Sequence, residues 1–485
     1  MNFNLVEMYN GLLRFNKHIL NELAEGLKHL PNLDGVSKGD SLIINEQGNP
    51  AWGSSAFIPT FENAAYGIEW TKNDNDIIRI GNAKFHRELP IQNRLKGCVY
   101  NEKKISYFLN PTGWAKPLEN GLIPPLDGSD GDVGVRVPEF YMCVKDTGTK
   151  YQLWISDFNI DGTFTRIHPF IISHTKTMTR TREDGKEEVF SACIKHDDTR
   201  YLGGNKNSSV VATKLQGRPR TEINYDKANE FCANRGDWIT MIDYLEYCAL
   251  QALCYIEYAN FNNQAALNTN LTSEGFKQGG LGAGVTNLEW NRWSRFNGNN
   301  PIVQTYWSAE HNIGNGNTNG DHYELSAYND DGSNFFTYPV FYHGIHLFGD
   351  IWSFVRDVVI INKDTDYNSV YLLKKGVAHA DVTVDNVDEK CYFIGYQANT
   401  NNYITEFDLQ RGPYFIPNLV RTNKKFDYNY IRGNNGQDTD KSVRVLLVGG
   451  SANHSSAAGS GRFASHWVRS ASYANVGFFT TVKLD

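Results

Sequence analysis

Several features that mark common protein classes are missing from this sequence. It has no long basic run, and its 54 acidic residues outnumber its 47 basic residues to give a net charge of -7, which argues against duplex nucleic acid as a partner. No stretch approaches the roughly 20 apolar residues that span a bilayer, and residues 1–10 lack the basic start of a signal peptide. We therefore predict a protein that is made in the cytoplasm and does not insert into membranes. If it works outside the cell, it must leave by lysis or inside a larger particle.

The cysteines form no disulfide framework. Their number is odd, and no CxxC pair occurs. Cys248 and Cys254 point to different faces of a predicted helix, so they are not expected to bridge each other. We expect buried, reduced thiols, as in a protein that folds in a reducing cytosol. The seven positions are Cys98, Cys143, Cys193, Cys232, Cys248, Cys254 and Cys391.

Signatures of metal and catalytic sites are also missing. The thirteen histidines include no H-x-x-x-H or H-E-x-x-H motif, and His168, His174 and His196 are too far apart in sequence to form one zinc site. Residues 157–162, D-F-N-I-D-G, match the start of a calcium loop, but the position of its bidentate glutamate is His168, so we predict a turn. No G-x-S-x-G motif occurs. We predict no metal, no cofactor and no enzymatic activity.

The sequence is instead rich in glycine and aromatic residues. Its 43 Gly, 26 Tyr and 27 Phe predict turn-rich β structure, and a length of 485 residues predicts roughly two to four domains. The predicted fold class is α+β. We divide the chain into an N-terminal helix (1–35), a linker with a short β-hairpin (36–60), a small β-rich domain (61–165) and a C-terminal ligand-binding domain (166–485).

The N-terminal helix carries a hydrophobic seam. Leu5, Met8, Leu12, Phe15 and Ile19 step by 3, 4, 3 and 4 residues, which is a short heptad pattern. A proline at position 31 ends the helix and a polar linker follows, so no adjacent domain obviously receives the seam. Two interpretations stay open: packing of the helix on its own domain, or self-association and docking onto another protein.

Local patterns predict the main elements of the two larger domains. Residues 224–234 are expected to form a helix that Gly236 stops, and an apolar stripe over residues 245–256 predicts a second helix, capped by Thr240 with Asp243. Strands are predicted at residues 77–80, 133–137, 151–155, 351–361 and 443–448, an exposed hairpin or loop at 176–188, and long loops at 260–319.

Residues 448–479 hold the strongest functional signal. Their two ends have strand character, and Gly449 with Gly450 predicts positive φ or a close backbone approach. Between the ends lie small polar residues interspersed with aromatic residues and arginines, a mixture typical of paratopes, where rigid aromatics anchor and small polar groups adapt. We therefore predict a binding surface. Its ligand-binding residues are predicted to be Asn453, His454, Arg462, Ser465, His466, Trp467, Arg469 and Tyr473.

Several motifs together resemble one family. G-G-S at 449–451, A-G at 458–459, N-V-G-F at 475–478 and G-I-H-L-F-G-D-I-W-S-F-V at 344–355 resemble the formylglycine-generating-enzyme type of C-type lectin fold. That form occurs in phage receptor-binding proteins and in the variable proteins of diversity-generating retroelements. Motifs at 66–70, 218–221, 233–238 and 255–264 are similar to virion fibre proteins of phages that infect gut Bacteroidales. The likeness covers residues 60–485.

The resemblance implies a non-enzymatic fibre of the virion that adheres to a glycan or protein on the host surface. It also implies a homotrimer whose N-terminal segment attaches to other virion structural proteins. The namesake enzyme of the fold uses cysteines late in its domain, whereas only Cys391 follows Cys254 here, so formylglycine-type oxidation is not expected. The identity of the receptor and placement on head or tail stay open.

Two alternatives to adhesion stay open. A glycan-degrading fibre domain would need paired carboxylates about 5 to 10 Å apart in a cleft. Glu222, Glu257, Glu310 and Asp321, around the predicted loops, are the candidates. A structural decoration of the head or tail would have no specific receptor.

Overall fold

The computed structural model divides the chain into two units, residues 1–60 and 61–485, which are described separately. In the first unit, β1 (Ser41–Ile44) and β2 (Pro50–Gly53) form the predicted antiparallel hairpin. The predicted helix with its seam residues Leu5, Met8, Leu12, Phe15 and Ile19 lies outside the described residues and stays a prediction. The structure describes residues 41–44, 50–53, 58–72, 77–195, 198, 201–203, 216–265, 267–268, 270–282, 302–319, 323–328, 334–337, 339–362, 367–398, 400, 402–421, 430–432, 442–452, 454 and 458–484.

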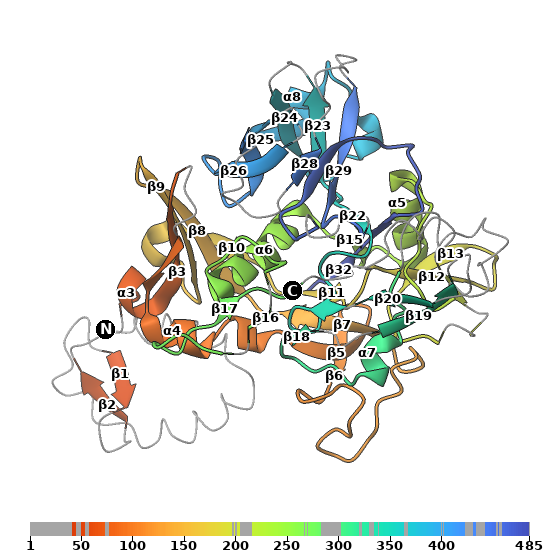
Figure 1. The fold of residues 1–485 in the computed structure, drawn as a ribbon, viewed down its shortest axis with the longest axis horizontal. Helices are drawn as coiled ribbons and strands as arrows, with labels where there is room; N and C mark the ends of the chain where they lie inside the picture. Colours follow the sequence, from red (N-terminus) through yellow and green to blue (C-terminus); the bar gives the residue numbers. More distant parts are fainter. Residues whose placement is uncertain are drawn as a thin grey trace, which may run out of the picture. The chain divides into compact units, whose positions relative to one another are not determined.

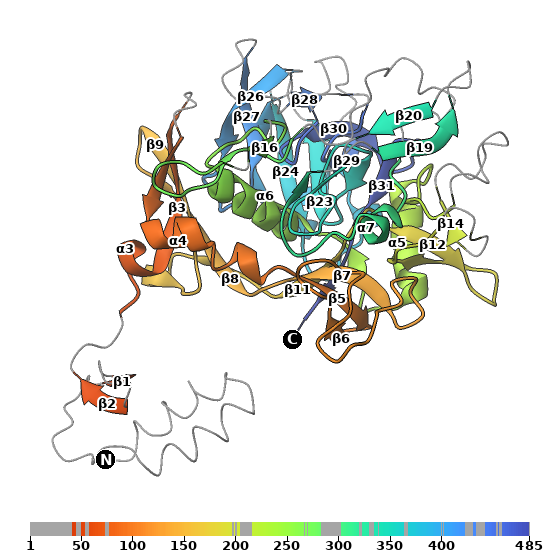
Figure 2. The same cartoon turned by 60° about the horizontal axis from the view of Figure 1, so that its bottom comes forward.

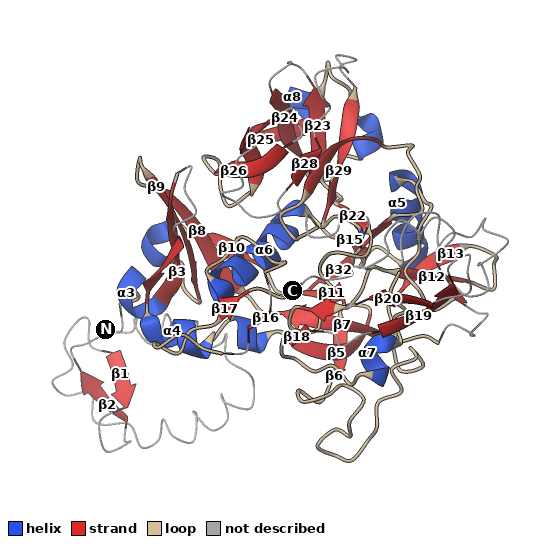
Figure 3. Ribbon diagram, in the orientation of Figure 1, coloured by secondary structure: helices blue, strands red, loops and turns tan. Residues whose placement is uncertain are grey.

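Residues 61–485 form a mixed α and β unit in which strands predominate (Figures 1 and 3). This confirms the α+β class at that level. None of the helices in the described residues is long and apolar enough to cross a membrane. The helices are α3 (Phe61–Ala64), α4 (Ala83–Glu88), α5 (Tyr225–Arg235), α6 (Tyr244–Tyr258), α7 (Trp307–Glu310) and α8 (Val387–Lys390).

Two sheets contain the strands of the predicted small domain. The first has the order β10-β8-β9-β3-β4, and the second has the order β15-β32-β11-β7-β5-β6. The first comprises β3 (Ala65–Thr71), β4 (Ile77–Gly81), β8 (Phe140–Asp146), β9 (Lys150–Ser156) and β10 (Thr165–Ile167). The second comprises β5 (Lys96–Asn101), β6 (Lys104–Phe108), β7 (Asp132–Val137), β11 (Phe170–Ser173), β15 (Thr240–Met241) and β32 (Thr480–Lys483).

The second sheet shows that the predicted domain boundary at residue 165 is wrong. Its strand β32, at the end of the chain, pairs with β11 and β15, and β11 pairs with β7. Strands from the predicted small domain and from the predicted C-terminal domain therefore share one ladder of hydrogen bonds. Alternation along the sequence predicts that a strand exists, but it carries no information on which distant strand becomes its partner. The boundary at residue 60 agrees with the division of the chain into units.

Helix α6 lies between the first sheet and the largest sheet (Figures 1 and 2). Every residue of α6 except Leu245 is buried, so the helix is a central element of the core. Asp243 is its N-cap and forms a reciprocal capping box with Glu246. The prediction that Thr240 takes part in capping α6 is wrong, because Thr240 lies in strand β15, three residues before the N-cap Asp243. Helix α5 lies within one residue of its predicted limits at each end, with Asn224 as its N-cap and Gly236 after its end.

The largest sheet carries the C-terminal segment. Its main path is β25-β24-β23-β29-β30-β28-β26-β27, and β22 joins β29 to β31. The strands predicted at 351–361 and 443–448 are confirmed as β22, β23 and β29. The ten strands are β22 (Trp352–Phe354), β23 (Val358–Asn362), β24 (Tyr367–Leu373), β25 (Cys391–Ala398), β26 (Asn402–Asp408), β27 (Ile416–Arg421), β28 (Tyr430–Arg432), β29 (Val443–Val448), β30 (Phe463–Val468) and β31 (Val476–Phe478).

Shorter strands complete the unit. The prediction that residues 176–188 form an exposed hairpin or loop is correct only in part. The turn between β12 and β13 is exposed as expected, but Lys176 is fully buried and pairs with Asp350 at 2.6 Å. All seven cysteines are buried and free, as predicted. The remaining strands are β12 (Met178–Thr181), β13 (Glu187–Phe190), β14 (Tyr201–Leu202), β16 (Leu267–Asn268), β17 (Gln278–Gly279), β18 (Thr318–Asn319), β19 (Tyr323–Tyr328), β20 (Asn334–Thr337) and β21 (Val340–Phe341).

Candidate functional site

The predicted binding segment begins with a framework part that does not face solvent. Arg462 is 2% exposed and Ser465 is 1% exposed, so their prediction as ligand contacts is wrong in this structure. Both residues are packed inside the protein: the Arg462 carbonyl accepts a hydrogen bond from the Gly449 N–H at 3.1 Å, and Ser465 belongs to the buried first half of β30. The guanidinium of Arg462 lies 5.4 Å from the centre of the Trp352 ring. A Cβ at Gly450, where φ is +69°, would meet the Arg462 side chain at 2.7 Å, which explains a glycine there.

His454 belongs to the loop after β29 and is half-buried. Its Nδ1 lies 3.0 Å from the Ser451 hydroxyl, and its ring packs edge-on against Trp352 at 5.2 Å. These contacts hold His454 against its own loop. Asn453 lies outside the described residues, so its predicted role stays a prediction.

The structure brings the other predicted residues together in the C-terminal turn, which we define as residues 466–473. The ring of Trp467 lies 4.4 Å from His466 and 4.2 Å from Tyr473. Tyr473 is 45% exposed, whereas Trp467 is half-buried and packs on the hydrophobic core. Trp467 is therefore a fixed anchor, and Tyr473 presents a ring to solvent.

Backbone contacts with the start of α5 hold the C-terminal turn in place. The carbonyl of Arg469 accepts a hydrogen bond from the Tyr225 N–H at 3.2 Å, and the carbonyl of Tyr473 accepts one from the Glu222 N–H at 2.9 Å. The Arg469 Nε also lies 3.3 Å from the carboxylate of Asp226. The turn is thus attached at two points to the first residue of α5 and to the segment that precedes this helix.

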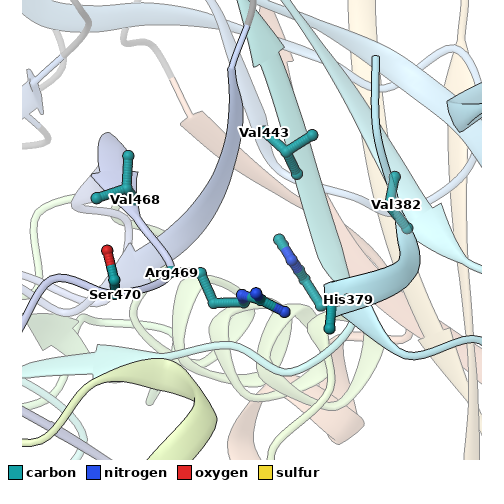
Figure 4. Close-up of a pocket in the computed structure, with 7 residues that line it drawn as sticks. His379, Val382, Val443, Val468, Arg469 and Ser470 are labelled. Atoms are coloured by element: carbon teal, nitrogen blue, oxygen red, sulfur yellow. The ribbon is translucent and has the colours of Figure 1, made fainter. Parts of the chain in front are cut away.

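A cavity of about 250 Å³ lies beside the C-terminal turn (Figure 4). Arg469 and His379 extend into it from different segments of the chain, and Figure 4 shows their side chains approaching each other. Valine side chains supply apolar walls. The lining residues are His379, Ala380, Val382, Val443, Val468, Arg469 and Ser470.

The electrostatics of this cavity depend on Arg469 and His379. Burial, together with the nearby positive charge of Arg469, lowers the pKa of His379 to about 4, so this ring is neutral at pH 7. The Nη1 of Arg469 is buried and has no hydrogen-bond partner among the described residues. A cationic donor and a neutral imidazole therefore share one small space with no carboxylate in its lining.

Sequence reasoning missed the part of the cavity that precedes β29. His379 begins a short 3-10 helix, His379–Asp381, and Val382 follows it. These residues carry no motif, and they are separated from the C-terminal turn by several strands. Only the pairing of β29 with β23 and β30 brings the two segments together, so no local signal in the sequence could have identified them.

Carboxylates proposed for the catalytic alternative do not line this cavity. Glu257 is buried, and its carboxylate accepts a hydrogen bond from Asn317 at 2.6 Å and lies 3.0 Å from His343 Nε2. Glu222 is half-buried and Glu310 is exposed, while Asp321 lies outside the described residues. Within the described part of the chain, no three His, Cys, Asp or Glu side chains are grouped to hold a metal ion.

Two larger cavities lie away from the predicted binding residues. One of about 540 Å³ lies beside Phe108 and Leu118, and another of about 780 Å³ surrounds Arg180 and Glu188. Glu188 is already paired there with Arg180 at 2.7 Å and with Arg235 at 3.0 Å.

No protein-family model matches the chain, and no curated protein matches its sequence. Function is therefore inferred from the residues and geometry of the site.

Proposed function

We propose that this protein is a non-enzymatic adhesin, a fibre protein of a phage virion that binds a glycan or protein on the host surface. The binding surface is the C-terminal turn with its adjoining cavity, on a C-type-lectin-like domain. The observation that carries this proposal is that Val468, Arg469 and Ser470, from the segment with paratope-like composition, line a cavity together with His379.

The chemistry of the surface supports binding more than catalysis. Tyr, Trp and Arg are the residues that most often carry binding energy at interfaces, and all three occur in the C-terminal turn. Acid–base catalysis at neutral pH is most efficient with a group that titrates near pH 7. His379, with a pKa of about 4, is not such a group, and no Asp or Glu lines the cavity.

The size of the cavity supports recognition of one small group at a time. Its volume of about 250 Å³ is below the range of roughly 300–1,000 Å³ that is usual for drug-sized ligands, so one sugar ring or one side chain is the natural occupant. A single contact of this size is weak. A homotrimer, assembled through the N-terminal seam and attached to other virion proteins, would add avidity of roughly 100-fold or more.

Attachment of the purified full-length chain to host cells tests this function. We expect the double variant Trp467→Ala with Arg469→Ala to lose at least about 30-fold in attachment, because both side chains are interface anchors. Lys84→Ala is the matched control, since Lys84 is an exposed residue of α4. Circular dichroism establishes that each variant is folded.

Two other results would replace the proposal. Unchanged attachment of the folded double variant would favour a structural decoration without a receptor. Release of new reducing ends from host capsular polysaccharide at a linear rate would show a glycan-degrading domain.

A further inference from the structure

The cavity beside the C-terminal turn contains a cationic group that its neighbours do not satisfy. The Nε of Arg469 lies 3.3 Å from the Asp226 carboxylate, and the Asp226 side chain is 52% exposed. A solvent-exposed pair of this kind is weak and exchanges readily with other anions. The Nη1 of Arg469 is buried and has no hydrogen-bond partner among the described residues, while the Arg469 side chain as a whole lines the cavity and is 34% exposed. A buried donor without a partner carries a desolvation cost that a ligand acceptor would remove.

The other groups of the cavity complement an anion. Ser470 supplies a hydroxyl donor, and neutral His379 can donate from one ring nitrogen. Val382, Val443 and Val468 form apolar walls, which lower the local dielectric constant and strengthen a charge-assisted hydrogen bond. None of the seven lining residues is acidic. The arrangement favours a small group that carries negative charge.

Building on the proposed adhesive function, we infer that this cavity binds the carboxylate of an acidic sugar. The planar guanidinium of Arg469 presents parallel N–H donors, which match the two oxygens of a carboxylate. The sugar ring fits the volume of about 250 Å³, and the carboxylate takes the Nη side of Arg469 while Asp226 keeps Nε. The rest of a glycan chain extends toward Tyr473, which is exposed on the same turn.

Binding of two matched sugars to the full chain tests this inference. Methyl glucuronide carries the carboxylate, and methyl glucoside has the same ring without it. We expect measurable binding of the glucuronide by titration calorimetry and at least about 10-fold weaker binding of the glucoside, because a charge-assisted hydrogen bond contributes a factor of this size or more. Acetyl-glutamate amide is the third probe, and binding equal to the glucuronide would identify a peptide carboxylate as the source.

Three variants separate the role of Arg469 from that of its neighbours. Arg469→Gln should weaken glucuronide binding about 10- to 100-fold, and Arg469→Lys should weaken it less, because lysine keeps the charge but loses the planar donor pair. Asp226→Asn should strengthen binding about 3-fold, since it removes a competing carboxylate next to Arg469. Lys84→Gln, on α4, should leave binding unchanged.

The outcomes distinguish this inference from the proposed function. Equal binding of glucoside and glucuronide, or unchanged glucuronide binding by folded Arg469→Gln, would overturn the carboxylate assignment. If that variant nevertheless loses attachment to cells, adhesion through the C-terminal turn stands without the carboxylate. If it loses the glucuronide but attaches normally to cells, the cavity site stands and adhesion through this surface fails.

Discussion

Two pairs of opposite charges illustrate how differently this chain uses polar residues. Lys176 and Asp350 are both 0% exposed and lie 2.6 Å apart in the framework, whereas Arg469 and Asp226 are 34% and 52% exposed and lie 3.3 Å apart. The first pair is sealed by protein, and the second borders a cavity. We therefore assign the buried Lys176–Asp350 pair to the stability of the fold and the exposed Arg469–Asp226 pair to the surface that a ligand can reach.

The buried pair also gives a structural role to part of the motif at 344–355. Burial opposes the charge on Asp350, but the adjacent ammonium of Lys176, with a contribution from His346, holds the pKa of Asp350 below its usual range. Lys176 donates a second hydrogen bond, to the His346 carbonyl, at 3.3 Å. The motif at 344–355 thus contributes one partner of a buried ion pair to the protein core.

The largest expected effect is the loss of the buried pair. Asp350→Asn leaves the Lys176 ammonium buried without its counter-charge, so we expect a loss of about 3–5 kcal/mol in the free energy of unfolding. Asp226→Asn breaks an exposed pair and should change it by less than about 0.5 kcal/mol. Denaturant unfolding of both variants measures the difference. Equal effects would contradict the division between framework and site.

The two arginines of the predicted binding segment should separate in the same way. Arg462→Ala removes a buried guanidinium from the face of Trp352, and we expect a loss of about 2 kcal/mol in the free energy of unfolding with attachment of the folded protein retained. Arg469→Ala should do the reverse, reducing attachment with little change in stability. If Arg462→Ala reduced attachment and Arg469→Ala reduced stability instead, the assignment of Arg462 to the core and of Arg469 to the binding surface would be wrong.

We expect the buried carboxyl group of Glu246 to make the stability of the protein depend on pH. Burial, with a contribution from Asp243, raises the pKa of Glu246 to about 8, above an unfolded value of about 4.3. A raised carboxyl pKa means that the folded state holds a proton that the unfolded state has released, so stability falls as pH rises from about 4 to 8. Glu246→Gln should flatten this fall in thermal unfolding measured from pH 5 to 8. An unchanged slope would exclude Glu246 as its source.

The smallest expected effect is at the binding cavity. His379, with a pKa of about 4, keeps one neutral form between pH 6 and 8, so binding of the glucuronide should stay constant over that interval. Calorimetric titrations at pH 6, 7 and 8 measure this. A rise in affinity toward pH 6 would mean that His379 gains a proton in the complex.

Local sequence signals predicted the elements of this fold well. Asn224 and Gly236 bound α5 because capping is a property of a few neighbouring residues. The positive φ values of Gly449 and Gly450 follow from the same local logic. Long-range pairing could not be predicted, which is why the pairing of β11 with β7 and β32 was missed and a domain boundary was placed between β7 and β11.

The candidate site was predicted only in part for the same reason. Trp467, Arg469 and Tyr473 were found from composition, since aromatic and arginine residues among small polar ones indicate recognition. The burial of Arg462 depends on its packing against Trp352, and the contribution of His379 depends on a segment far away in sequence from the C-terminal turn. Neither property is encoded near the residue itself.

The most direct test of adhesion through the C-terminal turn is hydrogen–deuterium exchange of the full chain with and without a uronate-containing host polysaccharide. The predicted result is protection of residues 466–473 together with residues 379–382, and of no other exposed surface. Protection confined to the backbone amides of β24 and β25, which carry the exposed residues Tyr367, Tyr392 and Tyr396, would contradict the proposal. It would move the binding surface to that edge of the sheet.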